Sequence, residues 1–71
     1  MSDTVAATLE APVQARVLGT AATGLSPEIM GLGPVEATER VLARCGLTVA
    51  DLDVVEINEA FASQVVASQR A

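Results

Sequence analysis

The sequence contains no histidine, tryptophan or tyrosine, and it has only one cysteine and one phenylalanine. One cysteine cannot form a disulfide within the chain, and a zinc site is not expected without histidine or further cysteines. Four basic residues against nine acidic ones give a net charge of −5, which argues against contact with nucleic-acid phosphates. No apolar run approaches the length of about eighteen residues that a membrane span requires. We therefore expect neither a nucleic-acid-binding protein nor a membrane protein.

The N-terminal segment has no recognisable targeting signal. Asp3 and Glu10 precede the first basic residue, Arg16, so the segment lacks both the basic start of a secretory signal and the Arg-rich bias of a transit peptide. We expect a cytoplasmic protein. We also expect residues 1–14 to form a flexible leader to a partial domain of residues 15–71.

The apolar residues are small. They make up 51% of the chain, which excludes ordinary disorder, yet aromatic residues make up only 1%. A core of alanine and valine needs close backbone packing, and a chain this short buries only about 60% of its unfolded surface. We expect an incomplete core that suits one layer of a larger α/β protein better than an independent small domain.

The sequence pattern predicts the order strand, helix, strand, helix. β-Branched residues favour a strand over residues 16–22, and the run LDVVEI at residues 52–57 is typical of a parallel strand covered on both faces. Pro34 suits the start of a helix that Gly46 ends, and Asn58 is a good N-cap for a second helix. The expected fold class is α/β, with parallel strands and open sheet edges.

Two short turns are expected between these elements. Ser26 precedes Pro27 and Glu28 and could cap one helical turn. Thr48 and Asp51 stand at the spacing of a capping box.

The stretch NEAFASQ, residues 58–64, resembles the Asn-Glu-Ala-Phe signature of thiolases, which make or cleave 3-ketoacyl-CoA. The resemblance extends over PEIMGLGPVEATERVLARCGLTVADLDVVEINEAFASQ, residues 27–64, and ARVLGTAATG, residues 15–24, resembles the preceding strand. Together they cover roughly residues 15–70. The resemblance implies a fragment of a thiolase C-terminal domain, and hence an acyltransferase by descent.

The resemblance also implies roles for particular residues. Asn58 matches the asparagine that holds a water, and this water helps to stabilise the enolate-like oxygen of the substrate. Met30 and Phe61 match positions that line the acyl and pantetheine pocket, although core packing would explain both equally well. Thiolases use coenzyme A thioesters as substrates, so no further cofactor and no metal are expected.

The departures from the family pattern are severe. Thiolases carry the acyl group on a cysteine thiolate, and they use a second cysteine in a Cys-x-Gly-Gly-Gly motif and a histidine in a Gly-His-Pro motif. The sequence has neither motif. Cys45 lies on the apolar side of the predicted helix, and we interpret it as a small core residue. We therefore expect the isolated chain to be inactive.

Other interpretations of these residues remain open. Asn58 would cap a helix whether or not it acts in catalysis, and Glu56 would need a hydrogen-bond partner if its strand is buried. The chain could also be a non-catalytic binding module, or one chain of a split enzyme. Its partners would be the missing parts of a thiolase, or a second copy paired through the exposed strand edges.

Overall fold

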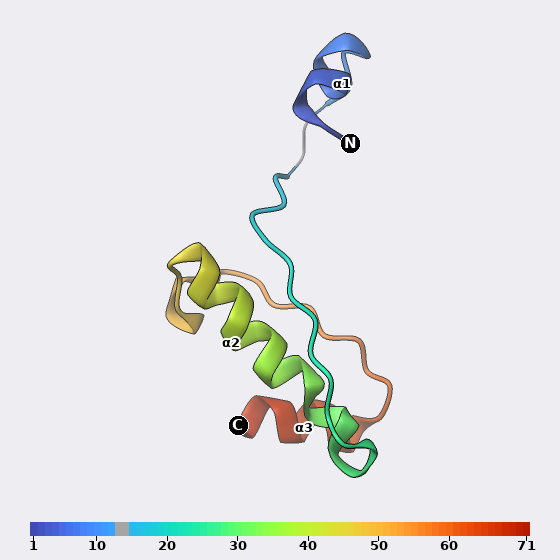
Figure 1. Ribbon diagram of the computed structural model, residues 1–71, viewed down its shortest axis with the longest axis vertical. Helices are drawn as coiled ribbons and strands as arrows, with labels where there is room; N and C mark the ends of the chain where they lie inside the picture. Colours follow the sequence, from blue (N-terminus) through green and yellow to red (C-terminus); the bar gives the residue numbers. More distant parts are fainter. Residues whose placement is uncertain (13–14) are drawn as a thin grey trace.

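Short helices joined by lengths of extended chain make up the fold. The structure, a computed structural model, describes residues 1–12 and 15–71. In chain order the helical elements are α1 (Asp3–Thr8), η1 (Pro27–Leu32), α2 (Gly33–Cys45), η2 (Val49–Asp51) and α3 (Ala62–Arg70), where η marks a 3-10 helix. Helix α1 stands apart at one end of the long axis, while α2 and α3 lie together at the other end (Figure 1). Within the described ranges, no helix is long and apolar enough to cross a membrane.

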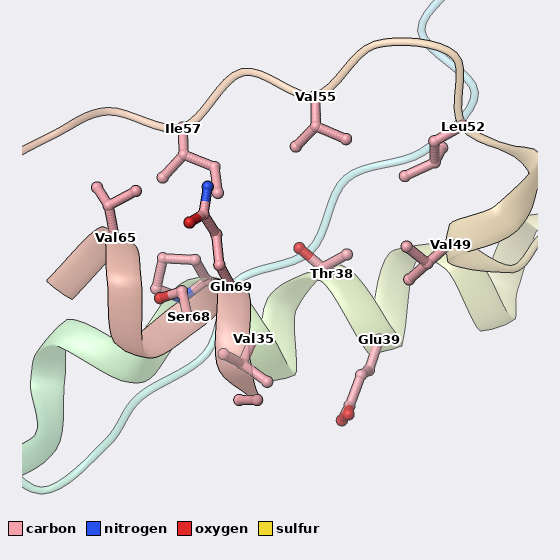
Figure 2. A pocket seen from close by; sticks show the side chains of 12 residues that line it. Val35, Thr38, Glu39, Val49, Leu52, Val55, Ile57, Val65, Ser68 and Gln69 are labelled. Carbon is pink, nitrogen blue, oxygen red and sulfur yellow. The ribbon is translucent and has the colours of Figure 1, made fainter.

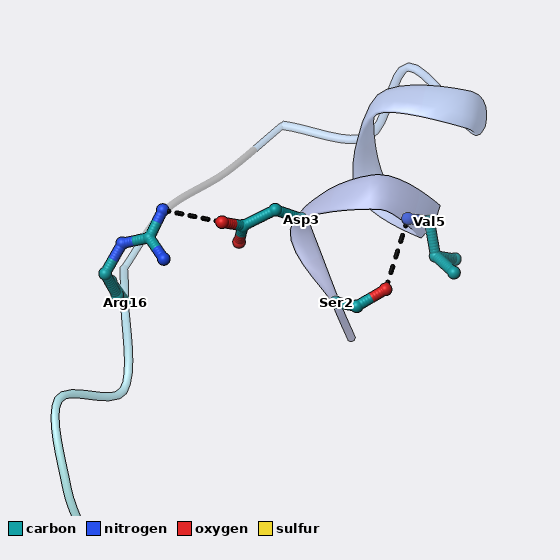
Figure 3. Close-up of polar contacts among 4 residues, drawn as sticks. All are labelled: Ser2, Asp3, Val5 and Arg16. Carbon is teal, nitrogen blue, oxygen red and sulfur yellow. Dashed lines mark hydrogen bonds and ion pairs between the residues drawn. The ribbon is translucent and has the colours of Figure 1, made fainter.

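Ser2 caps the N-terminal helix α1, and Asp3 in its first turn forms an exposed ion pair with Arg16. The Ser2 hydroxyl accepts a hydrogen bond from the Val5 backbone N–H at 3.2 Å, and Arg16 Nη2 pairs with Asp3 Oδ2 at 2.9 Å (Figure 3). The Arg16 and Asp3 side chains are 66% and 73% exposed, so this ion pair contributes little to stability. Part of the predicted leader is thus helical. Residues 13–14 of that leader lie outside the described residues.

Helix α2 is the element that the sequence predicted best. Pro34 lies in its first turn, and Gly46 follows its last residue in the left-handed conformation, with φ of 68°. The backbone N–H of Leu47 donates to the Leu42 carbonyl at 2.9 Å, which satisfies one of the free carbonyls at the helix end. Leu42 is also the buried residue of this helix, at 8% exposure. Glu36 and Arg40 form an i, i+4 ion pair on its surface.

The two predicted turns are confirmed as 3-10 segments. In η2 the Thr48 backbone N–H donates to Asp51 Oδ2 at 2.7 Å, and both halves of the capping box are present. These hydrogen bonds, first from the Thr48 backbone and then from its hydroxyl, lower the pKa of the Asp51 carboxyl. In η1, Ser26 occupies the cap position but makes no capping hydrogen bond, because its hydroxyl donates to the Glu28 carboxylate instead.

The predicted parallel strands are absent from the described residues, so the α/β assignment is wrong for this structure. Residues 16–22 and 52–57 have no regular secondary structure, with a bend at Asp53, and no ladder joins either of them to another segment (Figure 1). The first segment lies against α2 instead, where the Thr20 carbonyl accepts a hydrogen bond from Arg44 Nη1 at 3.0 Å. β-Branched residues favour an extended backbone, but a strand also requires a neighbour in register. The predicted burial fails too, since Val54 is 78% exposed.

The start of the last helix also differs from the prediction. Helix α3 begins at Ala62 with Phe61 at the N-cap position, three residues after the predicted N-cap at Asn58. Residues 58–61 turn locally instead, and the Ala60 N–H donates to the Asn58 carbonyl at 3.1 Å. The Phe61 side chain cannot accept a hydrogen bond, so the first turn of α3 has no side-chain cap.

We predict that the chain alone unfolds with low cooperativity, because only Ala6 and Leu42 are buried hydrophobic residues in the described part. A fully packed domain absorbs about 0.7 kcal/mol per residue on unfolding, or roughly 50 kcal/mol for this length. A thermal melt followed by circular dichroism should give a van't Hoff enthalpy below half of that value. A sharp two-state melt of full enthalpy, independent of protein concentration, would contradict the prediction.

We predict that acid weakens the η2 turn in a way that depends on Asp51. Because its pKa is lowered in the folded chain, the Asp51 carboxylate stabilises the turn above its unfolded pKa, and this contribution is lost as the pH falls through the folded pKa. The amide resonance of Thr48 should therefore titrate with a midpoint below 3.8. Asp51→Asn should abolish this titration, and Asp53→Asn should leave it unchanged. A Thr48 midpoint at or above the ordinary aspartate value would refute the prediction.

Candidate functional site

Met30 and Phe61, which are distant in the sequence, line one hollow of about 480 Å³. Residues of η1 form one wall, and residues 60–67, at the start of α3, form the other. Both side chains are largely exposed, at 69% and 68%. The hollow is therefore an open, mostly apolar surface feature that long side chains line from two separate elements.

A carboxylate also lines this hollow. Glu28 belongs to the same wall as Met30, and its carboxylate accepts a hydrogen bond from the Ser26 hydroxyl. This hydrogen bond, followed by one from its own backbone N–H, lowers the pKa of the Glu28 carboxyl. Glu28 is therefore negatively charged at neutral pH and suits an electrostatic role better than proton donation.

Asn58 is close in sequence to Ala60 and Phe61, which line this hollow, but it is not itself a lining residue. It belongs to the extended segment between η2 and α3, three residues before Phe61. Its side chain is exposed and makes no hydrogen bond to any other described residue. The carboxamide is thus free to bind a water or a ligand. The structure brings Met30 and Phe61 to one hollow, and Asn58 is not part of its lining.

A second and larger hollow, of about 690 Å³, was not anticipated from the sequence. It lies between α2, α3 and the extended segment after η2 (Figure 2). Val55 and Ile57 point from that segment toward the helices, and Val35 and Val65 line the same hollow from α2 and α3. Val55 and Ile57 are two residues apart, a spacing that could have indicated one apolar face. We predicted instead a buried strand that is covered on both faces.

The remaining titratable groups do not add a catalytic centre. Cys45 is a free, half-buried thiol that lines neither hollow, and it lies against Gly19. Glu56 is exposed and makes no hydrogen bond within the described ranges. Because its carboxylate is in contact with solvent, it does not need the hydrogen-bond partner that a buried strand would have required. Among the described residues, no group of three or more His, Cys, Asp or Glu side chains could hold a metal ion.

Comparison with known proteins identifies the family. Residues 11–71 match the C-terminal domain of thiolase. The chain is 53% identical over 64 residues to a 3-ketoacyl-CoA thiolase of Shewanella sp. (strain W3-18-1) and 55% identical to one of Shewanella denitrificans. Each match covers 90% of this chain and 16% of the relative, so the chain spans about a sixth of the length of these enzymes. The chain belongs to the thiolase family, within its C-terminal domain.

Proposed function

We propose that the chain forms part of the acyl-CoA site of a 3-ketoacyl-CoA thiolase. In that reaction, acetyl-CoA and an acyl-CoA give 3-ketoacyl-CoA and free CoA, or 3-ketoacyl-CoA and free CoA give the two thioesters in the reverse direction. The observation that carries the proposal is the shared hollow of Met30 and Phe61. A mostly apolar hollow with a few polar groups at its edge suits the acyl chain and pantetheine arm of such a substrate.

Asn58 would take part in stabilising the oxyanion. Its carboxamide N–H would donate to a water, and that water would donate to the enolate-like oxygen that forms at the thioester. The exposed side chain supports this role, since no other described residue occupies its hydrogen-bonding groups. A donor aimed at developing negative charge stabilises the transition state more than the ground state.

The rest of the reaction must come from residues beyond this sequence. The acyl-carrying thiolate, the cysteine that moves the α-proton and the histidine that assists Asn58 have no counterparts in a chain with one half-buried cysteine and no histidine. The partner is therefore the remainder of a thiolase, with a cytoplasmic location. Pairing through exposed strand edges is not proposed, because the described residues form no strands.

We predict that the chain alone has no measurable thiolase activity and that activity requires the remaining parts of the enzyme. The test mixes or co-expresses the chain with a Shewanella 3-ketoacyl-CoA thiolase that lacks the segment matching residues 11–71. Cleavage of acetoacetyl-CoA by CoA is then followed spectrophotometrically. Turnover only in the mixture supports the acyl-CoA role. A stable complex without turnover would point to a binding module, and turnover by the chain alone would exclude the proposal.

We predict that Asn58→Ala lowers kcat in the reconstituted enzyme by about 10- to 1,000-fold with a smaller change in KM, because the donor acts on charge that develops in the transition state. Asn58→Asp, which keeps the shape but not the N–H donor, should be equally impaired. Gln69→Ala is the matched control, since it removes an exposed amide that lines the other hollow. Equal rates for the Asn58 and Gln69 variants would exclude a role for Asn58 in the oxyanion hole.

A further inference from the structure

The wall of the Met30–Phe61 hollow that carries Met30 is not held by regular helical geometry. Within η1, Ile29 has non-helical dihedral angles, φ −121° and ψ 18°, which interrupt the segment immediately before Met30. A continuous helix would fix Met30 through its own backbone hydrogen bonds. Here the position of residues 30–32 depends on what they pack against.

The contact that holds this wall is made through Gly31. A Cβ atom placed on Gly31 would lie 3.1 Å from Gln64 Cγ and 3.4 Å from Gln64 Cβ, so the backbone of η1 approaches α3 more closely than most Cβ atoms approach a neighbour. One turn further along α3, the Ser68 hydroxyl donates to the Gly31 carbonyl at 3.5 Å, the outer limit for a hydrogen bond. Two residues on one face of α3 therefore meet the same glycine.

The Gln64 side chain is confined at this contact. Its Oε1 atom is buried and has no hydrogen-bond partner among the described residues. The atoms that face Gly31 are Cβ and Cγ, close to the helix backbone. Gln64 therefore cannot give way by moving only the end of its side chain.

We propose that Gly31 is a positioning residue whose close contact with Gln64 sets the distance between Met30 and Phe61. Met30 precedes Gly31 directly, and Phe61 lies at the start of the helix that carries Gln64. A larger residue at position 31 displaces η1 from α3 and widens the hollow. That the hollow binds acyl-CoA rests on the proposed function. The contact between Gly31 and Gln64 does not depend on that function.

The test uses nuclear magnetic resonance on the full 71-residue chain with ¹³C-labelled methionine methyl groups. Phe61 is the only aromatic residue, so any ring-current displacement of the Met30 methyl signal comes from its ring, and Phe61→Leu measures that displacement. We expect Gly31→Ala to remove at least half of it, together with the nuclear Overhauser contacts between residues 31 and 64. Gly24→Ala is the matched control, because a Cβ there meets nothing within 4 Å, and it should change neither signal.

A compensating variant separates positioning from simple destabilisation. Gln64→Ala removes the Cγ atom that the new methyl group would strike, so Gly31→Ala/Gln64→Ala should recover the displacement that Gly31→Ala loses. The proposal is overturned if the unmodified chain shows no contact between residues 31 and 64, if Gly31→Ala leaves the Met30 signal in place, or if the double variant shows no recovery. None of these measurements needs turnover, so they remain decisive even if the acyl-CoA function is refuted.

Discussion

Close approach of backbone at glycine is the interaction on which the rest of this structure depends. A chain rich in small apolar residues gains little from contacts between large side chains, so its elements must pack where no side chain separates them. Gly19 brings the first extended segment against α2, where a Cβ would lie 3.2 Å from Cys45 Sγ and 3.3 Å from Val41 Cγ2. Gly31 brings η1 against α3 in the same way. These two contacts join the first extended segment to α2 and η1 to α3.

Elements whose hydrogen bonds are local were predictable from the sequence. The start of α2 near Pro34, its end at Gly46 and the capping box of Thr48 and Asp51 each depend on residues a few positions apart. The predicted strands failed for the opposite reason. Residues 16–22 and 52–57 have the composition of strands, but a ladder depends on neighbouring segments, and a single run of sequence carries no information about whether they are present. Neither segment is helical, and neither forms a ladder among the described residues.

The candidate site was predictable only through the resemblance to thiolases. Composition and spacing gave Met30 and Phe61 no priority over ordinary core residues, yet both line one hollow. Asn58 shows the limit of local reasoning, because its excellent capping chemistry predicted a helix start that the structure places at Ala62. The helix begins later since residues 58–61 satisfy a local turn first. The larger hollow beneath Val55 and Ile57 was missed because it is built by three elements together.

The contact between η1 and α3 has a consequence for the order of folding. The hydrogen bond from Ser68 to Gly31 spans 37 residues, whereas the bonds of α2 and η2 join near neighbours. Bringing distant residues together costs loop entropy that local bonds do not. We expect α2 and η2 to form early and α3 to dock afterwards. The hollow between Met30 and Phe61 would then be among the last features to assemble, and among the first to open when the chain is destabilised.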